Sequence, residues 1–507
     1  MNNNKQIKSG VLLSYVSLFA GLAINLFYTP ILLEKLGQSE YGVYTLAVSI
    51  TSYLSLFGFG LSSAYVYFYS KYLKQSEEAV ACLNGTFLKL FLGVAVMVFV
   101  AGGILSLNAS AIFGGKLSSE EDATLSVMIF LLSISMAADF AASIFMAYIT
   151  ANERFVVLKC MSILSTMFKP AISLLLLYFG VKSIAVVIGT LTTVVIIDSF
   201  YIIYAVKKLN MRILFKNIAG VEFREIVQYS GYIFIIMIVD QINWNVDKIL
   251  LGLIKGTLSV AVYGVAAQIN TLFMSFSTAV SSVYVPRIHF IKTEKTDEAE
   301  CNRALTDVLV QVGGFQFLIL VLIYSGFCFF GRPFLNNWAG QGYEDAYYVL
   351  LLLLGSELIP LTLNVGIEIQ RAKNKQKIPT IVATVQAVAN VIISIPLCYK
   401  WGVIGCSVGT AMVMVCGSVF KAIYYQVVLK LEMKYFWMKI GRLCRGLIVP
   451  VTGGILMLEF CVIESYLQII FYAGIYAMLY LISIVMLGLS KEERSQLTRK
   501  LVQFRRQ

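Results

Sequence analysis

Charged residues are scarce in this sequence of 507 amino acids: only 13% are Asp, Glu, Lys or Arg, whereas 59% are hydrophobic. A soluble domain carries about a quarter charged residues, so the deficit excludes a large polar catalytic domain. A disordered chain is excluded as well, because disorder requires a low content of hydrophobic residues. The polar linkers that separate the domains of a long soluble protein are also missing. The composition therefore predicts an integral membrane protein with many spans.

Histidine and paired cysteines are almost absent. The one histidine, His289, stands in a basic loop, and no two of the nine cysteines are spaced as Cys-x-x-Cys. The sequence thus offers no zinc-ligand set and no disulfide framework. One loop histidine cannot build a nucleophile–base pair, and no phosphate-binding Walker loop is present. We expect neither an enzyme nor a resident metal or cofactor.

Fourteen apolar stretches are each long enough to cross about 30 Å of hydrocarbon as a helix. Lipid offers no partner to an open sheet edge, so we expect an all-α membrane protein. The first stretch follows a polar start without a small-residue cleavage site, which predicts a retained span and no cleaved signal peptide. The stretches cover approximately residues 11–33, 41–66, 85–107, 123–150, 155–179, 183–206, 227–253, 258–285, 306–330, 345–368, 378–399, 402–428, 443–463 and 466–489.

The positive charges orient these spans. If the N-terminus is cytoplasmic, the inner segments hold 30 Lys and Arg residues and the outer segments hold 6. Positive charge accumulates on the cytoplasmic side of membrane proteins, so both termini are predicted to be cytoplasmic. The same distribution explains the net charge of +12 without a nucleic-acid partner.

Two parts of the chain resemble each other at a constant offset of 219 residues. Residues 43–66 and 262–285 share nine identities over 24 ungapped positions, including Tyr44 with Tyr263 and Phe57 with Phe276. Chance similarity between apolar helices is the alternative. An offset of six spans keeps the orientation, so a true repeat predicts two parallel six-helix lobes, a design typical of secondary transporters. The expected parts are lobe one at 1–210, lobe two at 211–430, and two further spans with a basic cytoplasmic tail at 431–507, with hinges at 207–224 and 430–445.

Four short motifs resemble bacterial polysaccharide flippases of the Wzx type. Residues 28–33 (YTPILL) and 36–44 (LGQSEYGVY) resemble the first loop of that family, 53–62 (YLSLFGFGLS) its second span, and 245–252 (NVDKILLG) its mid-chain signature. The family belongs to the multidrug/oligosaccharidyl-lipid/polysaccharide exporter superfamily.

This resemblance implies a fourteen-helix, V-shaped, two-lobed protein of the bacterial cytoplasmic membrane. It would move undecaprenyl-diphosphate-linked oligosaccharide to the outer leaflet for O-antigen, capsule or exopolysaccharide synthesis. Membrane lipids, a polysaccharide polymerase and glycosyltransferases would be its partners. Two other functions stay open: a cation-coupled multidrug or small-metabolite exporter of the same superfamily, and a glycan polymerase or ligase. The short outer loops, about 108–122 and 331–344, disfavour the second.

Ionisable residues within spans are costly and are therefore the first candidates for a transport site. In span 7, Asp240, Asn243 and Asp247 are spaced i, i+3 and i+7 on one helical face, and Lys248 follows directly. This stripe predicts either a cavity wall with a proton or sodium site, or a structural polar contact inside lobe two. Proton or sodium coupling is attractive because protonation removes the cost of keeping a carboxylate charged in low dielectric.

Spans 10 and 11 carry further polar side chains. Glu357 and Asn364 share a face of span 10 with Pro360 between them, and proline removes a helix hydrogen bond. We expect a kink there, either in a moving part or as simple packing. In span 11, Gln386 and Asn390 are spaced i, i+4 and serve either to bind sugars or to join helices.

Lobe one contributes Asp139, Lys169 and Asp198. Lys169 is its deepest cation and either meets the diphosphate or pairs with Asp139 or Asp198. Lys89 and Lys421 stand near the predicted cytoplasmic ends of their spans, where snorkelling to the surface explains them.

Overall fold

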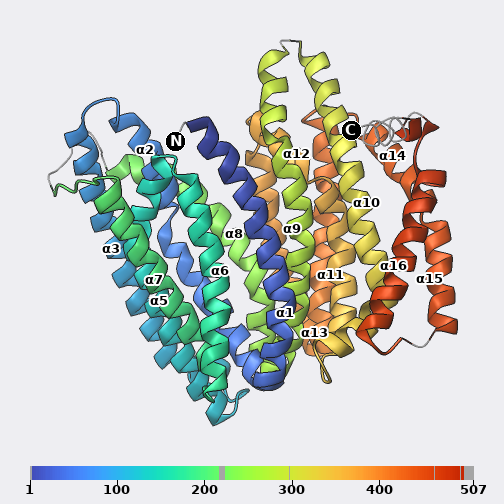
Figure 1. The fold of residues 1–507 in the computed structure, drawn as a ribbon, viewed down its shortest axis with the longest axis horizontal. Helices are drawn as coiled ribbons and strands as arrows, with labels where there is room; N and C mark the ends of the chain where they lie inside the picture. The colour runs from blue at the N-terminus through green and yellow to red at the C-terminus, as the bar shows by residue number, and fades with distance from the viewer. Residues whose placement is uncertain (1–2, 216–222, 296, 462, 492, 496–507) are drawn as a thin grey trace. The chain divides into compact units, whose positions relative to one another are not determined.

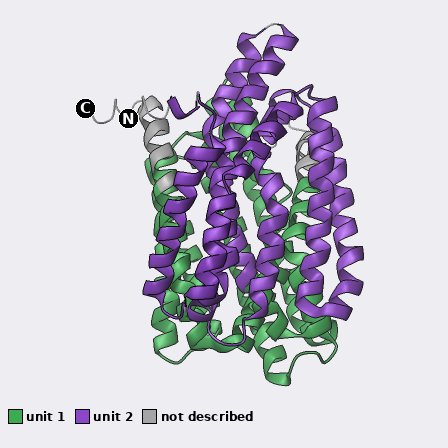
Figure 2. Cartoon of the chain, turned by 90° about the vertical axis from the view of Figure 1, so that its right-hand side faces the viewer, with its two compact units in different colours: residues 1–264 green, residues 265–507 purple. Residues whose placement is uncertain are grey.

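The computed structural model describes residues 3–495, apart from 216–222, 296, 462 and 492. The described residues form helices and connecting loops, without a strand among them. This confirms the all-helical prediction. Figure 1 shows that most helices are long and run roughly side by side within each part of the chain. Two compact units are distinguished, residues 1–264 and 265–507, which Figure 2 shows in different colours.

Ten helical stretches of the described chain are long and apolar enough to cross a membrane, or eleven if one bent pair counts as a span. The two longest are each long enough for two crossings, because one crossing needs about 20 residues. The stretch Val16–Tyr72 has 57 residues, and Lys377–Val427 has 51. The count of fourteen spans therefore stays a prediction, whereas the multi-pass membrane architecture is established.

Glycines interrupt both of these long stretches. Gly37 has φ 73° and Gly402 has φ 59°, values that only glycine adopts without strain. Gly37 falls in the predicted loop between spans 1 and 2, and Gly402 is the first residue of predicted span 12. Gly256, between two further helices, has φ 86° and lies 219 residues after Gly37, at the offset of the internal repeat. The chain therefore turns at equivalent positions of the two similar segments.

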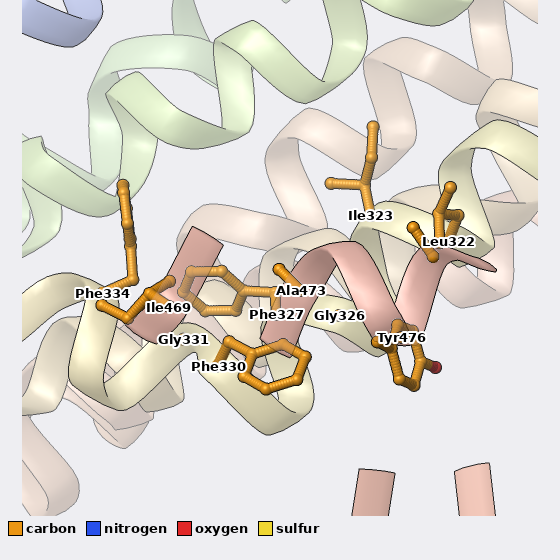
Figure 3. Close-up of a pocket in the computed structure, with 11 residues that line it drawn as sticks. Leu322, Ile323, Gly326, Phe327, Phe330, Gly331, Phe334, Ile469, Ala473 and Tyr476 are labelled. Atoms are coloured by element: carbon orange, nitrogen blue, oxygen red, sulfur yellow. The ribbon is translucent and has the colours of Figure 1, made fainter. Parts of the chain in front are cut away.

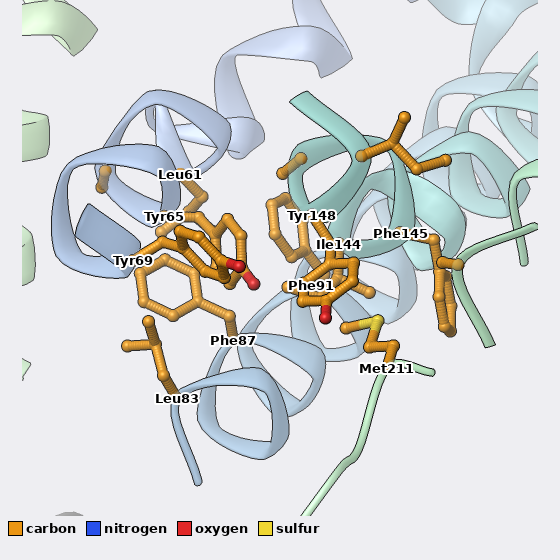
Figure 4. Close-up of a cluster of buried hydrophobic side chains, with 14 of the residues drawn as sticks. Leu61, Tyr65, Tyr69, Leu83, Phe87, Phe91, Ile144, Phe145, Tyr148 and Met211 are labelled. Atoms are coloured by element: carbon orange, nitrogen blue, oxygen red, sulfur yellow. The ribbon is translucent and has the colours of Figure 1, made fainter. Parts of the chain in front are cut away.

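Unit 1 is built around the contacts of α5 with α3 and α7, of α6 with α1 and α7, and of α8 with α1 and α2. Its core is aromatic near one end: Tyr65 meets Phe87 edge-on at 5.2 Å, and Tyr69 meets Tyr148 at 5.7 Å. Figure 4 shows these rings gathered with Phe91 among α2, α3 and α5. The elements are α1 (Asn3–Ser52), η1 (Tyr53–Gly58, a 3₁₀ helix), α2 (Leu61–Tyr72), α3 (Glu77–Leu107), α4 (Ala109–Phe113), α5 (Ser119–Ala151), α6 (Phe155–Tyr178), α7 (Ile184–Ile203), η2 (Tyr204–Lys208, a π turn), α8 (Phe223–Lys255) and the start of α9 (Thr257–Glu294).

Unit 2 is organised by α10, which packs against α11, α14, α15 and α16, while α11 packs against α13. Leu305, Leu309, Tyr425 and Phe436 are buried together in its main core. Its elements are the rest of α9, α10 (Glu298–Trp338), α11 (Asp345–Thr362), α12 (Asn364–Ala372), α13 (Lys377–Val427), α14 (Met433–Arg445), α15 (Ile448–Phe460), α16 (Tyr466–Ser483) and η3 (Ile484–Gly488, a π turn).

The C-terminal part departs from the sequence prediction, which places a hinge at 430–445 and a single span at 443–463. Instead α14 and α15 are two helices of 13 residues each, bent by 40° at the residues that join them. The physical reason is that buried side chains recur at Met433, Phe436, Ile440 and Leu443, a helical spacing hidden by the charges between them. The other expected hinge, 207–224, lies partly outside the described residues.

Candidate functional site

Asp247 is the most deeply enclosed acid of the stripe predicted on α8. It is only 2% exposed, and its Oδ2 accepts a hydrogen bond of 2.6 Å from the Tyr263 hydroxyl of α9. Lys248, the next residue, is close enough for its charge to act on the Asp247 carboxylate. A carboxylate inside an apolar helix bundle needs such compensation, because an unpaired buried charge costs several kcal/mol. The two side chains form a charge-compensated polar centre within unit 1.

The remainder of this polar stripe is less enclosed. Asp240 is exposed and Asn243 is half-buried, although both share a face with Asp247. Asp240 and Asp247 are seven positions apart, about 10 Å along the helix axis, so neighbouring helices cover one and leave the other open. The predicted stripe thus has one exposed acid and one enclosed acid.

A second polar chain fixes α8 to the 3₁₀ helix η1. Gln241 Nε2 donates to Ser55 Oγ at 3.0 Å, and Asn245 Nδ2 donates to Gln241 Oε1 at 2.8 Å. These amides lie one turn apart, on the side of α8 that contacts η1. Their hydrogen bonds orient α8, and with it Asp247, against the break that precedes α2. Sequence reasoning did not identify Ser55, because its partner lies 186 residues away.

Two acids of unit 1 face each other on α5 and α7. Asp198 is 8% exposed, and its Oδ2 has no hydrogen-bond partner within the described chain. Asp139 is more open, and the charges of the two carboxylates act on one another. Lys169 of α6 forms no ion pair with either acid in the described residues. The ion pair expected for Lys169 is therefore not formed in this structure, which leaves its ammonium available to another anion.

In unit 2, Glu357 of α11 is 7% exposed. The charge that acts on it comes from Lys421 of α13, without a direct ion pair between them in the described chain. Lys421 is half-buried. Besides snorkelling to the surface, its charge therefore has a buried acid on which to act. The sequence did not indicate that Lys421 acts on Glu357, because the two residues are 64 positions apart on α13 and α11. Local hydropathy carries no information about such partners.

The interruption predicted near Pro360 is present where α11 ends and α12 begins. The Leu361 carbonyl accepts a hydrogen bond of 2.8 Å from Ser277 Oγ, and Asn364 Nδ2 donates to Ser281 Oγ at 3.1 Å. Gln316 of α10 donates from Nε2 to the Ser277 carbonyl at 2.9 Å. Side chains of α9 and α10 thus take the place of the helix hydrogen bonds lost at the break. Asn364 is one of the residues whose side chains form these hydrogen bonds at the break. Ser277 and Gln316 also form them, and the sequence did not indicate either residue.

Gln386 and Asn390 join the two halves of α13. Gln386 Nε2 donates to the Val413 carbonyl at 3.1 Å. The Asn390 Oδ1 accepts from Ser394 Oγ at 2.9 Å and from Thr410 Oγ1 at 3.2 Å. These contacts favour the helix-joining alternative for both amides, because one polar atom of each is already bonded to the second half of α13.

One polar cluster at an end of unit 1 was not anticipated. Glu121, at the start of α5, accepts hydrogen bonds of 2.5 Å from both Ser39 Oγ and Thr257 Oγ1. It borders a cavity of about 230 Å³ that is also lined by Glu120 and Lys182. The hydrogen bond and charge of Glu120, together with the charge of Glu40, raise the pKa of the exposed Lys182. The cluster fastens α1 and α9 to the first turn of α5.

An apolar cavity of about 330 Å³ lies between α10 and α16 in unit 2. Figure 3 shows Phe327, Phe330 and Phe334 of α10 on one side and Ile469 and Tyr476 of α16 on the other. Hydrocarbon suits these walls better than a sugar does, because sugar hydroxyls would find few hydrogen-bond partners there.

Long apolar helices that enclose polar side chains place the chain in the class of multi-pass membrane proteins. The fold is similar to that of the "Lipid II flippase MurJ, inward closed conformation" (TM-score 0.73, 19% identity, 94% of this chain and 98% of that one). It is also similar to the MATE transporter VcmN of Vibrio cholerae (TM-score 0.56, 12% identity, 86% and 99%). Identities this low establish the shared fold alone.

The chain belongs to the family described as "Polysaccharide biosynthesis protein", which matches residues 7–292. It is 20% identical over 385 residues to the "Putative O-antigen transporter" of Shigella flexneri, covering 74% of this chain and 87% of that protein. It is also 21% identical over 213 residues to a "Probable low-salt glycan biosynthesis flippase" of Haloferax volcanii, covering 42% and 44%. The family resemblance drawn from the motifs is confirmed, and the family is one of transporters, not enzymes.

Proposed function

We propose that this protein is a flippase that moves lipid-linked oligosaccharide across the bacterial cytoplasmic membrane, from the inner to the outer leaflet. The observation that carries the proposal is the family match over residues 7–292, supported by two relatives whose names specify O-antigen transport and glycan flipping. The lipid is undecaprenyl diphosphate, and the product serves cell-surface polysaccharide synthesis. Glycosyltransferases supply the substrate and a polymerase consumes it; nucleic acid has no part in the reaction.

The movement is alternating access between lobe one (1–210) and lobe two (211–430), with fourteen spans and both termini cytoplasmic. The 219-residue offset between Gly37 and Gly256, both in the left-handed region, supports the repeat that underlies the two lobes. Two parallel lobes can rock about a site near the midplane without unfolding either lobe. The distribution of Lys and Arg supports the orientation.

Asp247 and Glu357 are the proposed coupling groups, and each has a lysine nearby whose charge acts on it. A proton or sodium ion that binds one of these carboxylates neutralises its charge and releases the lysine from its attraction. A bias of about 1.4 kcal/mol changes the ratio of two conformations tenfold, so this exchange is sufficient to drive a switch. Asp240 and Asn243 line the path beside Asp247.

Lys169 is proposed to meet the diphosphate, because it is half-buried and the structure leaves it without an acidic partner in the described residues. An ammonium donates up to three hydrogen bonds to phosphate oxygens. Asp139 and Asp198 belong to the same unit and are acids that can take up a cation. The headgroup would thus pass basic and acidic side chains, while its lipid tail stays in hydrocarbon.

The test is translocation in vesicles that contain the purified protein and a defined undecaprenyl-diphosphate oligosaccharide. Sugars that become accessible to a membrane-impermeant lectin report flipping, with a proton or sodium gradient imposed in separate arms. We expect gradient-dependent exposure of the sugar. Efflux of a cationic dye without exposure of the sugar would instead identify a drug exporter and refute the proposal.

The coupling groups are tested by Asp247→Asn and Glu357→Gln, with Glu459→Gln on the exposed face of α15 as the matched control. Each coupling variant is expected to lower gradient-driven flipping at least tenfold, because a neutral amide cannot take up the coupling ion. The control should flip at the wild-type rate. If both buried variants also flip at the wild-type rate after normal purification, these carboxylates are structural and coupling lies elsewhere.

A further inference from the structure

The amphipathic helix α14 presents two contrasting faces. Met433, Phe436, Ile440 and Leu443 are buried, and at 100° per residue they occupy a stripe about 80° wide. This stripe belongs to the main core of unit 2, where α10 packs against it. This stripe fixes one side of the helix, and the character of the exposed side determines what else the helix meets.

The opposite face combines cations with large apolar side chains. Trp437 is 37% exposed and Met438 57%, and Lys434 and Arg445 are exposed as well. At 100° per residue these four side chains fall within about 100° of one another. Neither Lys434 nor Arg445 forms an ion pair with any described residue. An isolated Trp–Met surface flanked by unpaired cations is unfavourable in water and is matched to a membrane interface.

The other two cations of the helix have a different role. Lys439 Nζ lies 3.0 Å and Arg442 Nη2 3.2 Å from the carboxylate of Glu493. Those charges are consumed in fixing α14 to the segment after α16. Lys434 and Arg445 differ from Lys439 and Arg442, because their charges are directed to the surroundings of the protein.

The length of α15 fixes the depth at which α14 lies. Its 13 residues rise only about 20 Å, less than the roughly 30 Å of a hydrocarbon core. Because α15 alone is too short, the 40° bend where α14 joins α15 lies within the hydrocarbon, and α14 completes the crossing. This places α14 across the boundary between acyl chains and headgroups, on the side where positive charge is predicted to accumulate.

We infer that the exposed face of α14 is a docking surface for anionic phospholipid. Lys434 and Arg445, at opposite ends of α14, each bind the phosphate of a headgroup, while Trp437 and Met438 enter the boundary between headgroups and acyl chains. This surface is distinct from the transport path and independent of which molecule is carried. Its role is to bind a charged lipid at the junction between unit 2's core and its last helices.

The test uses the full-length protein in nanodiscs with brominated lipid, which quenches tryptophan fluorescence at short range. The emission of Trp437 is obtained by subtracting the spectrum of Trp437→Phe. At equal mole fraction, brominated phosphatidylglycerol is expected to quench this emission several-fold more strongly than brominated phosphatidylcholine. Soluble inorganic phosphate added in excess should leave the difference unchanged.

The preference should disappear in Lys434→Gln/Arg445→Gln and persist in Lys434→Arg/Arg445→Lys, which keeps both charges. Lys400→Gln is the matched control, because Lys400 also accompanies an exposed tryptophan, with its Nζ 5.1 Å from the Trp401 ring. Size-exclusion profiles verify that each variant is folded. Equal quenching by the two lipids, or a preference that survives loss of both α14 cations, would overturn the assignment.

Discussion

Individual polar residues inside the helices meet partners that belong to other helices. Asp247 binds the hydroxyl of Tyr263, and Glu357 lies within the influence of Lys421. Each such partner reduces the cost of removing a polar group from water. Removing such a partner should therefore lower the free energy of unfolding. Two positions outside the proposed transport site, Asn84 and Glu493, test this expectation.

Asn84 is the first of these positions, being fully buried on α3. Its Oδ1 accepts from the Tyr65 hydroxyl at 2.6 Å and its Nδ2 donates to the Arg212 carbonyl at 2.8 Å. Asn84→Ala leaves both partners unsatisfied and should destabilise the protein by about 2–3 kcal/mol, against about 1 kcal/mol for Tyr65→Phe. The midpoints of thermal unfolding in detergent show whether Asn84→Ala is more destabilising than Tyr65→Phe. Asn108→Ala, on an exposed residue, should change the midpoint little, and equal midpoints for all three would contradict the expectation.

Glu493 gives a prediction for pH dependence. Burial alone would raise its pKa, but the Ser490 N–H and the cations Lys439 and Arg442 outweigh burial and hold the pKa below its usual range. A depressed pKa means that the stabilisation is complete above the ordinary glutamate value of about 4.3 and is lost as pH falls through the folded-state value. Because the group is partly exposed, we expect about 1 kcal/mol or less at pH 7.

The measurement is the difference in thermal midpoint between wild type and Glu493→Gln across pH 3 to 7. The difference should be largest near neutrality and shrink at the acidic end. Glu432→Gln provides the comparison, since Glu432 is exposed and 4.0 Å from Arg303. If the difference in midpoint between wild type and Glu493→Gln increases as pH falls, the Glu493 contacts do not stabilise the ionised form.

The sequence identified which residues were costly in a membrane, but not which groups would accompany them. Asp247 and Glu357 stood out because charge within an apolar run is rare. Tyr263 appeared only as a repeat residue, and Lys421 was assigned to the surface. The bond from Tyr263 to Asp247 depends on the packing of α8 against α9, and the approach of Lys421 on the packing of α11 against α13. Hydrophobic periodicity within one helix does not encode such pairs.

At the scale of elements, hydropathy predicted which segments form helices. The breaks and bends within them depend on contacts with other helices. The predicted boundary between spans 11 and 12 coincides with Gly402 inside α13. Span 2, predicted as continuous, is interrupted by η1 and by Gly60 at φ 68°. Gln241 reaches Ser55 at this interruption, so the broken segment is stabilised by another helix. Predictions about span ends are therefore reliable only where a glycine or proline marks the end in sequence.

Gly402 tests how strictly the turn within α13 depends on glycine. Its φ of 59° and ψ of −134° lie in a region closed to residues with a Cβ atom, so Gly402→Ala should cost about 1–3 kcal/mol. Gly441 lies within α14, and a Cβ there would meet nothing within 4 Å. Gly441→Ala should therefore stabilise the protein slightly, by up to about 1 kcal/mol. Thermal midpoints of the two variants should move in opposite directions, and an unaffected Gly402→Ala would refute the strained turn.

For the whole molecule, composition and motifs led to the correct class and family, because both are properties of the entire chain. The polysaccharide family match and the superfamily fold agree with the resemblance seen in residues 28–62. The number of crossings is harder to obtain, since long helices such as α1 and α13 continue through a turn. The side of the membrane on which each turn lies is predicted from the distribution of Lys and Arg and not from packing. This prediction can be tested directly.

Topology is tested by single cysteines introduced into a variant whose nine native cysteines are replaced. Lys116→Cys, in the exposed segment between α4 and α5, should react with a membrane-impermeant maleimide in intact cells. Lys375→Cys, in the exposed turn between α12 and α13, should react only after the membrane is permeabilised. The expectation follows from the concentration of Lys and Arg around residue 375, which the positive-inside rule assigns to the cytoplasm. Labelling of position 375 in intact cells would invert the orientation, and with it the direction in which the proposed flippase carries its substrate.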